Sequence, residues 1–505
     1  MVTLKSILLA GLVHLHLHAL CGLAWAAWAS SSPTPQQIVR DLQASLSPGS
    51  EIVLTTDPAY ARDFKQRFAV AAPPTYVVGV KPVTVSDVQA VVRYSASKNV
   101  PFLATGGGHG YTFSLGRLES GIELDMGNFH SIAIDPVANT LTVGGAVQIG
   151  NVTAALLAAG RELPVGQCAT VGLTGLTMGG GVGPYGGIYG AASDSLLSVE
   201  FVTGTGDILN VSATHHADLF YGVKGAGFNY GVATRLTYRV YPLTNNGDVM
   251  VVNTQFPGPL NGSVWELASQ FVGRQPKELT LDFSLRWNES SGGMVAWCSF
   301  YYVGPQAEGL RLIQPFLNLG PLNVEIHAAK YNSISDVALY NAEGVGAIRG
   351  ISFVPYSVNL YAVDPPSLIS LFNYMNATMT GRPDLQTATL AWAQFSTYGF
   401  QLFPVESSAF PYRDVAVFFQ YDGFGFNASQ IPALDEFGKN VRSLMRPGSG
   451  RTDLEVYVHF GHGDEGPAAW YSAAKLPRLN ALKAVYDPKN LFSYYNPVQR
   501  GRYGH

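Results

Sequence analysis

The chain has 505 residues, more than one ordinary hydrophobic core can hold, so we expect two or three domains. Hydrophobic residues make up 47% of it and charged residues 13%, which is a globular composition. The formal net charge of −4 provides no basic field, and the sequence therefore argues against nucleic acid as a partner.

The N-terminus has the features of a secretory leader spanning residues 1–29. Lys5 precedes apolar stretches at 7–13 and 19–27, and Ala27-Trp28-Ala29 fits a cleavage site with small residues. A membrane anchor is the alternative, but the run falls short of the roughly 18–20 apolar residues that span a bilayer. The residues that interrupt it are His14, His16 and His18. We expect a secreted protein without stable membrane insertion after leader cleavage.

Two further features agree with a secretory route. Six Asn-x-Ser/Thr sites predict N-glycosylation, and they start at Asn151, Asn210, Asn261, Asn288, Asn376 and Asn427. Once the leader and its Cys21 are removed, only Cys168 and Cys298 remain, too few for a disulfide scaffold. One lies in a glycine loop and the other in an apolar run. They match poorly as a pair, so at least one cysteine needs another explanation.

The N-terminal half predicts alternating helices and strands. The segment Thr84-Val-Ser-Asp87 is typical of a capping box at the start of a helix, and it lies between strands expected at 75–80 and 100–103. This strand–helix–strand order indicates an α/β unit. Further helices are expected at 36–46 and 151–159, and further strands at 122–125, 131–135, 140–143, 198–202, 208–211 and 232–241.

A second domain is expected to begin where the composition changes, near residues 243–247. Long aromatic strands occupy 250–302 and 389–421 and alternate with helices, which favours an α+β domain built on an antiparallel sheet. The helices expected in this half lie at 307–317, 367–379 and 471–484.

A pair of glycine-dense turns is the strongest functional signal. The first is Thr105–Tyr111, which contains His109, and the second runs from Cys168 to Gly183. Glycine lets backbone N–H groups approach a bound anion, and each turn adds a nucleophile, an imidazole or a thiol. These nucleophiles are 59 residues apart (168 − 109), and together the turns suggest one large cofactor held by both.

The second turn also contains Gly181-Val-Gly183-Pro-Tyr-Gly186, which satisfies the dinucleotide pattern G-x-G-x-x-G. That pattern needs a strand before it and a helix that opens at its third glycine. Residues 174–178 are too short and glycine-bound for a clear strand, and Pro184–Gly187 is not expected to start a helix. We therefore do not expect a Rossmann fold; the alternative reading of the glycines is a tight turn.

In this order, the motifs resemble the FAD-binding region of the vanillyl-alcohol-oxidase superfamily, and best its berberine-bridge-enzyme-like and oligosaccharide-oxidase branch. The resemblance covers about residues 75–241 and the last thirty residues. It is carried by Val78–Pro82, Gly106-Gly-Gly-His109-x-Tyr111, Cys168-x-x-Val-Gly172-x-x-Gly175, Gly179-Gly-Gly-x-Gly183, Tyr189-Gly190, Asp194, Asp218-Leu-Phe220, Gly225-x-Gly227-x-x-Gly231-Val232, Ala409–Arg413, Tyr457-Val-His-Phe460 and Tyr486–Phe492.

The resemblance implies an α+β fold. A PCMH-type FAD-binding domain of two α/β subdomains would be followed by a substrate domain whose antiparallel sheet has helices on one face. The FAD-binding domain is expected at 30–245, with its core at about 70–245, and the substrate domain at 246–465. Residues 466–505 would form a C-terminal segment that returns to the FAD-binding domain.

The same resemblance implies FAD held by two covalent bonds, from His109 to the flavin 8α-methyl group and from Cys168 to flavin C6. A neutral imidazole and a partly exposed thiolate suit an electron-poor ring. The alternative is a buried structural cysteine with a capping histidine. Other residues implied in cofactor binding are Thr105, Gly106, Gly107, Gly108, Gly110, Val171, Gly172, Gly175, Gly179, Gly180, Asp194, Val232 and Asn496. No metal is implied.

Four residues are candidates for the chemistry beside the flavin: Tyr457, Gln420, Tyr111 and His459. Tyr457 matches a tyrosine that works with a carboxylate in oligosaccharide oxidases, but that carboxylate falls near Gln394 here. Gln420 cannot take a proton, which argues against an alkaloid-type base, and Asp422 should share its strand face. Core packing is the alternative role for each aromatic residue.

The sequence thus predicts an FAD-dependent oxidase that removes a hydride from a small organic molecule and returns the electrons to O₂. Aromatic stretches at 390–400 and 415–421 are expected to line an apolar pocket, which favours a hydrophobic secondary-metabolite alcohol or phenol. Two alternatives stay open: an oligosaccharide oxidase that forms lactones, and a binding protein on a flavin fold that has lost catalysis.

Overall fold

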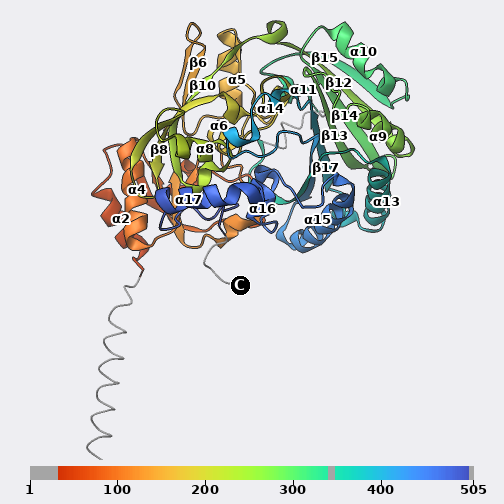
Figure 1. Ribbon diagram of the computed structural model, residues 1–505. Helices are drawn as coiled ribbons and strands as arrows, with labels where there is room; N and C mark the ends of the chain where they lie inside the picture. Colours follow the sequence, from red (N-terminus) through yellow and green to blue (C-terminus); the bar gives the residue numbers. More distant parts are fainter. Residues whose placement is uncertain (1–31, 339–346, 500–505) are drawn as a thin grey trace, which may run out of the picture.

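The computed structural model describes residues 32–338 and 347–499, so the predicted leader lies outside the described residues. Two lobes stand side by side in Figure 1. The N-terminal lobe contains two small sheets, and the other lobe contains one seven-stranded sheet. In the described part of the chain, no helix is long and apolar enough to cross a membrane.

The first sheet of the N-terminal lobe has the strand order β1-β2-β4-β3, with β2, β4 and β3 parallel. Helix α4 (Val85–Lys98) connects β2 to β3, and its predicted capping box is confirmed, since Thr84 and Asp87 bond each other's backbone N–H. The remaining elements of this unit are α2 (Pro35–Gln43), β1 (Glu51–Leu54), α3 (Pro58–Asp63), β2 (Tyr76–Lys81), β3 (Phe102–Thr105) and β4 (Gly121–Asp125).

The second sheet of this lobe is antiparallel and has the strand order β5-β6-β10-β8-β9. Its strands are β5 (Ile132–Asp135), β6 (Thr140–Gly144), β8 (Leu196–Thr203), β9 (Ile208–Ser212) and β10 (Gly231–Arg239). Helices α5 (Ile149–Ala158), α6 (Leu173–Met178) and α8 (Ala217–Ala226) accompany it, and a small ribbon pairs β7 (Arg161–Glu162) with β11 (Tyr241–Pro242).

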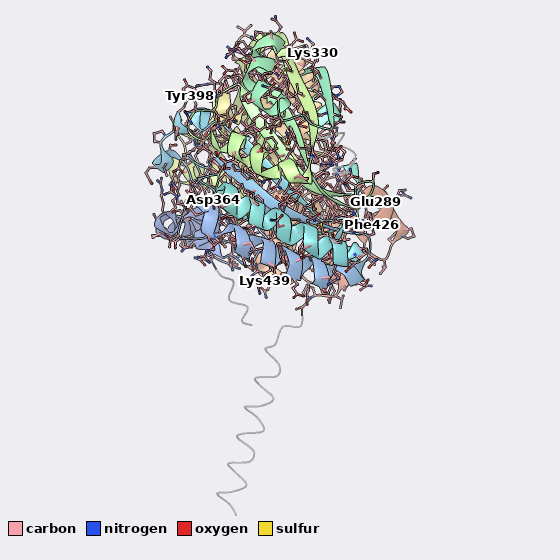
Figure 2. The ribbon with its side chains drawn as sticks, turned by 90° about the vertical axis from the view of Figure 1, so that its right-hand side faces the viewer. Glu289, Lys330, Asp364, Tyr398, Phe426 and Lys439 are labelled. Atoms are coloured by element: carbon pink, nitrogen blue, oxygen red, sulfur yellow. The ribbon has the colours of Figure 1, made fainter. Side chains whose placement is uncertain are left out.

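The seven-stranded sheet is antiparallel throughout, in the order β15-β12-β14-β13-β17-β18-β16. Its strands are β12 (Asp248–Pro257), β13 (Leu279–Asn288), β14 (Gly293–Tyr302), β15 (Asn323–Lys330), β16 (Ser352–Leu360), β17 (Thr389–Phe395) and β18 (Val417–Gly425). Four helices cover one face, as Figure 2 shows for the helix that Asp364 caps and the helix that carries Lys439. They are α9 (Asn261–Ser269), α10 (Gln306–Leu317), α13 (Pro365–Gly381) and α15 (Ile431–Met445).

Strand alternation divides the side chains of this sheet between the helices and the N-terminal lobe. On β13, Leu281 and Phe283 belong to the core beneath the helices. Thr280 and Asp282 point the other way, because the Thr280 hydroxyl donates to the Pro184 carbonyl 3.2 Å away, across the lobe boundary. The face of the sheet that the helices leave uncovered therefore forms one wall of the space between the lobes.

The C-terminal segment crosses back to the N-terminal lobe (Figure 1). It carries α16 (Pro467–Tyr471) and α17 (Leu476–Tyr486), and the buried Lys483 ammonium donates to the Asn229 carbonyl at 2.8 Å. The helix predicted at 471–484 is confirmed from Leu476 onward as α17, but its predicted start is wrong, because the chain breaks at Ser472, whose φ of 66° lies in the left-handed region.

Three further helices are short: α7 (Gly186–Tyr189), α11 (Ile334–Val337) and α14 (Tyr398–Gln401). A helix was not expected at 184–187, so α7 corrects that prediction. Helix α7 does not follow a strand, since residues 173–178 form helix α6. The dinucleotide pattern therefore still lacks the strand that it requires. The predicted domain boundaries stay predictions.

Candidate functional site

A cavity of about 490 Å³ lies between the lobes, within the range of small-molecule and cofactor sites. Both glycine turns, the second sheet and the C-terminal segment line it, and the seven-stranded sheet contributes Ala393 and Phe395. No aspartate or glutamate is among its described lining residues, whereas Arg67 is. Such a lining favours a ligand with an anionic group.

The two glycine turns touch through their backbones at one wall of this cavity. A Cβ atom on Gly107 would lie 2.3 Å from the backbone nitrogen of Gly172, closer than any real contact. Conversely, a Cβ atom on Gly172 would lie 2.8 Å from the nitrogen of Gly107. Glycine at both positions is therefore what allows turns so distant in sequence to meet.

His109 follows this contact and lines the cavity. Its Nε2 atom lies 2.8 Å from Thr170 Oγ1 and 3.0 Å from Arg349 Nη1, and the Phe68 ring stacks on the imidazole at 5.0 Å. Burial, together with the nearby cations Arg349 and Arg67, lowers the pKa of His109 to about 3. The imidazole is consequently neutral at physiological pH.

Cys168 lines the cavity from the second turn, with its Sγ atom 3.4 Å from Thr170 Oγ1. Cys298 instead lies on β14 in the core beneath the helices, where burial raises its thiol pKa well above the usual value. Neither thiol is in a disulfide within the described residues. The expectation that the two cysteines do not pair is confirmed.

Tyr457 and His459 reach the cavity from the C-terminal side. The Tyr457 hydroxyl oxygen accepts a hydrogen bond from the Gly181 N–H at 3.0 Å, and burial raises its pKa well above the usual value. His459 Nε2 lies 3.1 Å from the Leu176 carbonyl oxygen, and its Nδ1 lies 3.0 Å from the Tyr495 hydroxyl. A carbonyl only accepts, so Nε2 carries the ring proton and both nitrogens are engaged.

Tyr111 also lines the cavity and is linked to a carboxyl group behind it. Its hydroxyl donates to Gln420 Oε1 at 3.2 Å, and Gln420 Nε2 donates to Asp422 Oδ1 at 2.6 Å. Gln420 and Asp422 thus share one face of β18, as predicted, but neither lines the cavity. Burial raises the pKa of Asp422 to about 7.

Comparison with known proteins identifies the family. Residues 77–212 match the FAD binding domain family, and residues 456–499 match the family described as berberine and berberine like. The FAD-linked oxidoreductase azaL of Aspergillus niger is 35% identical over 458 residues, which cover 90% of this chain and 97% of the relative. This chain belongs to the FAD-linked oxidoreductases.

Solved structures of low identity show the same fold. The Physcomitrella patens BBE-like 1 structure has a TM-score of 0.79 at 21% identity and covers 93% of this chain and 100% of its own. An Acremonium strictum glucooligosaccharide oxidase has a TM-score of 0.79 at 19% identity, covering 92% and 99%. The α+β architecture with a PCMH-type FAD-binding domain is thereby confirmed.

The cavity of this FAD-linked oxidoreductase has features that fit its cofactor. A Cβ atom on Gly175 would meet nothing within 4 Å, so the cavity wall is open there to a ligand. The Thr174 hydroxyl is buried at the same wall and has no hydrogen-bond partner among the described residues, which leaves it for a ligand. The cavity lining also includes Arg67 and, among the described residues, no acidic residue, which suits the diphosphate of FAD.

Most residues predicted from the sequence for cofactor binding line this cavity. They are Thr105, Gly106, Gly107, Gly108, His109, Gly110, Cys168, Val171, Gly172, Gly175 and Val232. Four others do not line it. Gly179 packs on the ring of His459, and Gly180 packs on the ring of Phe410.

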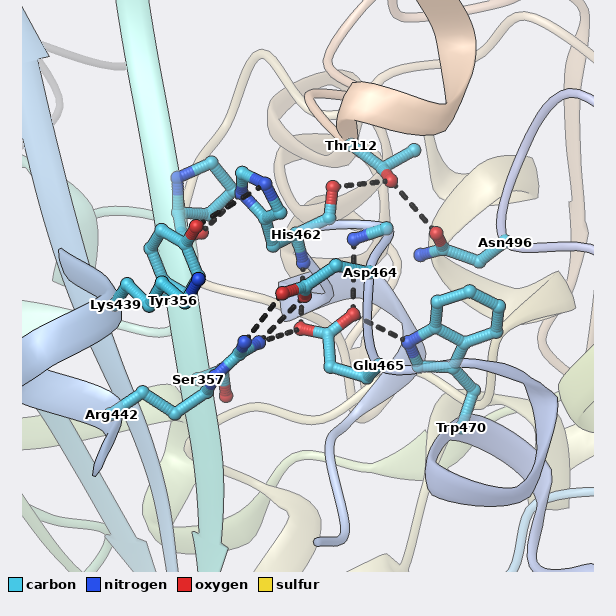
Figure 3. Close-up of polar contacts among 12 residues, drawn as sticks. Thr112, Tyr356, Ser357, Lys439, Arg442, His462, Asp464, Glu465, Trp470 and Asn496 are labelled. Atoms are coloured by element: carbon cyan, nitrogen blue, oxygen red, sulfur yellow. Dashed lines mark hydrogen bonds and ion pairs between the residues drawn. The ribbon is translucent and has the colours of Figure 1, made fainter. Parts of the chain in front are cut away.

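Asp194 and Asn496 lie outside the cavity wall and bond other parts of the protein, and their role in cofactor binding stays a prediction. Asp194 forms a buried ion pair with Arg413, with side-chain exposures of 0% and 3%. Removing one partner of such a pair typically costs about 3–5 kcal/mol, so its first role is in stability. Asn496 accepts from the Thr112 hydroxyl at 2.7 Å (Figure 3). It also donates at 2.8 Å to the carbonyl of Val458, the residue after Tyr457.

Figure 3 also shows the partners of His462 and Asp464, which with His459 were considered as a metal site. The His462 ring stacks on Tyr356 at 4.2 Å, and Asp464 pairs with Arg442 at 2.6 Å. Within the described residues, no group of three or more His, Cys, Asp and Glu side chains is arranged to hold a metal ion.

Gln394 does not occupy the place of a carboxylate that could assist Tyr457. It pairs across the sheet with Leu281 and donates to the Ala268 carbonyl at 3.1 Å, so it faces the helices. The residues of β17 that line the cavity are its neighbours Ala393 and Phe395. Side chains alternate between the two faces of a strand, so Gln394 faces away from the cavity while its two neighbours face it. Contrary to expectation, no residue in 415–421 lines the cavity.

Sequence reasoning missed a second polar group on the sheet face. Gln167, which lines the cavity, donates to Asp282 Oδ2 at 2.7 Å, and the Tyr301 hydroxyl donates to the same oxygen at 3.0 Å. Burial raises the pKa of Asp282 to about 6. A charged residue within an otherwise apolar strand was the available signal, because such residues are rarely buried without partners.

The raised pKa of Asp422 predicts a pH effect on stability. In the folded protein its carboxyl holds a proton up to about pH 7, whereas in the unfolded chain it releases the proton near the ordinary value of 3.8. Folding therefore takes up a proton between these values, and this contribution to stability falls as the pH rises through that window. Asp422→Asn removes the contribution and keeps an oxygen that can accept from Gln420.

We expect the melting temperature of the wild type to fall more steeply from pH 5 to pH 8 than that of Asp422→Asn, measured by scanning fluorimetry. The exposed Asp453→Asn is the matched control and should follow the wild type. Parallel curves for Asp422→Asn and the wild type would show that the Asp422 carboxyl is ionised throughout.

Proposed function

We propose that this FAD-linked oxidoreductase holds its flavin through covalent bonds to both His109 and Cys168. One observation carries the proposal: the two side chains reach the same cavity wall from separate turns and lie 2.8 Å and 3.4 Å from a single hydroxyl, Thr170 Oγ1. The Acremonium strictum oxidase, whose structure reveals a novel flavinylation, has the same fold.

The state of each side chain supports this attachment. The low pKa of His109 leaves a neutral imidazole, which is the nucleophilic form. Cys168 is only partly buried and lies at the cavity wall, and a thiol is an intrinsically strong nucleophile once deprotonated. When bound, FAD supplies hydride acceptance, so the protein has to place the substrate and manage its proton.

We assign the substrate-side roles to Tyr457 and Tyr111, both of which line the cavity. The Tyr457 hydroxyl oxygen accepts a hydrogen bond from the Gly181 N–H. The hydroxyl proton of Tyr457 therefore points to another partner, which suits a hydrogen bond to a substrate hydroxyl. Tyr111 donates to Gln420, so its oxygen lone pairs are available to a substrate hydroxyl. Both ring nitrogens of His459 are hydrogen-bonded, and they hold the Tyr495 hydroxyl and the Leu176 carbonyl in place.

The substrate that best fits the lining is a hydrophobic alcohol or phenol, with O₂ as the electron acceptor. Leu176, Ala393, Phe395 and Phe460 contribute apolar surface, and no carboxylate lines the described wall. The Gln167–Asp282 pair favours a second candidate, because a sugar would need polar partners of this kind. That candidate is an oligosaccharide oxidase.

A secreted, N-glycosylated enzyme is part of the proposal. Three of the six sites, Asn151, Asn210 and Asn427, are exposed and open to a glycan. Asn261 is buried and donates to the Gly258 carbonyl at 2.6 Å, so this site should stay unmodified once folded. Peptide mass analysis after endoglycosidase treatment should find glycan remnants at exposed sites, and an unmodified protein would contradict secretion by this route.

The first test concerns the flavin. We expect purified protein to be yellow and to keep its flavin on the polypeptide after acid precipitation. His109→Ala and Cys168→Ala should each leave one bond, and the double variant should release all flavin into the supernatant. Peptide mass spectrometry identifies the bonded residue in each case, and flavin retained covalently by the double variant would refute the assignment.

The second test concerns the substrate. Hydrogen peroxide release should be measured with phenolic and polyketide alcohols and, in parallel, with cello-, xylo- and chito-oligosaccharides. We expect turnover with the first group and a loss of at least about 100-fold in kcat/KM for Tyr457→Phe, the usual size of a general acid–base contribution. Turnover confined to the sugars would favour the second candidate.

A further inference from the structure

Thr170 connects the two proposed attachment residues. Its Oγ1 atom lies 2.8 Å from His109 Nε2 and 3.4 Å from Cys168 Sγ. It belongs to the second glycine turn, two residues after the cysteine, whereas the histidine comes from the first turn. One hydroxyl therefore bridges side chains that are 59 residues apart in sequence (168 − 109).

The hydrogen bonds around Thr170 have a direction. Arg349 Nη1 lies 3.0 Å from His109 Nε2, and a guanidinium only donates, so Nε2 is an acceptor and the neutral ring carries its proton on Nδ1. A hydroxyl can donate and accept at once. Thr170 can thus donate to Nε2 while it accepts from the Cys168 thiol, and the bonds run from sulfur through oxygen to the imidazole.

The backbone fixes the position of this hydroxyl. On either side of Thr170, the carbonyls of Ala169 and Val171 accept from the N–H groups of Gly150 and Ile149 at 2.8 Å and 3.0 Å, at the start of α5. The Gly107–Gly172 contact then holds the turn against the loop of His109. Backbone contacts within the protein therefore set the position of the bridge.

We propose that Thr170 is a positioning residue for flavin attachment, whose hydroxyl orients the imidazole of His109 by donating to it and orients the Cys168 thiol by accepting a hydrogen bond from it. The inference rests on the covalent attachment proposed above. Each attachment replaces one N–H or S–H bond and one C–H bond of the cofactor by an N–C or S–C bond. Molecular oxygen takes up the two electrons and two protons as hydrogen peroxide.

Thr170→Val tests this role because it keeps the shape of the side chain and removes the hydroxyl. In full-length protein incubated with FAD in air, we expect attachment at both residues to slow about tenfold, the effect of one lost hydrogen bond. Thr170→Ser keeps the hydroxyl and should restore the wild-type rate. The readouts are flavin fluorescence of the denatured protein and the masses of the His109 and Cys168 peptides.

Thr177→Val is the matched control, since it removes another buried threonine hydroxyl, one that bonds the Tyr238 hydroxyl at 2.8 Å and does not line the cavity. It should attach flavin at the wild-type rate. A Cys168→Ala background isolates the histidine bond, which Thr170→Val should still slow.

The outcomes separate the two hypotheses. Wild-type attachment rates in Thr170→Val, or equal slowing in Thr177→Val, would overturn the positioning role and leave the proposed function intact. Wild-type protein that bonds flavin at neither residue would overturn the proposed attachment itself.

Discussion

The backbone contact between Gly107 and Gly172 is the constraint on which the site depends. The first turn leaves the end of a parallel strand, and the second is tied to the start of α5, so each is anchored in a different sheet unit. Because no side chain separates them, His109, just after Gly107, and Cys168, just before Gly172, can share one cavity wall. A methyl group at Gly107 would push the turns apart and separate the imidazole from the thiol.

The opposite wall depends on the alternation of the seven-stranded sheet. Every strand except β15 sends apolar residues into the core beneath four helices and leaves a mixed face toward the N-terminal lobe. That mixed face carries Asp282 and Asp422, and each is bonded by an amide side chain, Gln167 or Gln420. These amide hydrogen bonds satisfy the two buried carboxyl groups beside the cavity, so that neither needs an ion pair.

Local signals in the sequence were sufficient for much of this. The capping box at Thr84 and the two glycine turns encode their own geometry, because a cap or a tight turn is decided by a few neighbouring residues. Helix and strand positions in the N-terminal half followed for the same reason. The positions of His109 and Cys168 on one wall came from the family resemblance, since spacing alone cannot bring distant turns together.

Residues whose role depends on register or on a distant partner could not be placed in this way. Asp194 lies within a flavin-family motif, yet its carboxylate pairs with Arg413, 219 residues away. Gln394 is one residue out of phase with the cavity face of its strand, and a shift of one residue exchanges the two faces. The break at Ser472 interrupts an otherwise helical pattern through a backbone angle that composition does not reveal.

The route of the chain also orders events during synthesis. Tyr457 and Tyr495 form part of the cavity wall, and α17, between them in sequence, is fastened to the N-terminal lobe through Lys483. A nascent polypeptide that has already folded both glycine turns still has an open side where these aromatic rings belong. The wall of the flavin cavity is therefore complete only once the chain through Tyr495 has been made, so the cavity closes after both glycine turns have been synthesised.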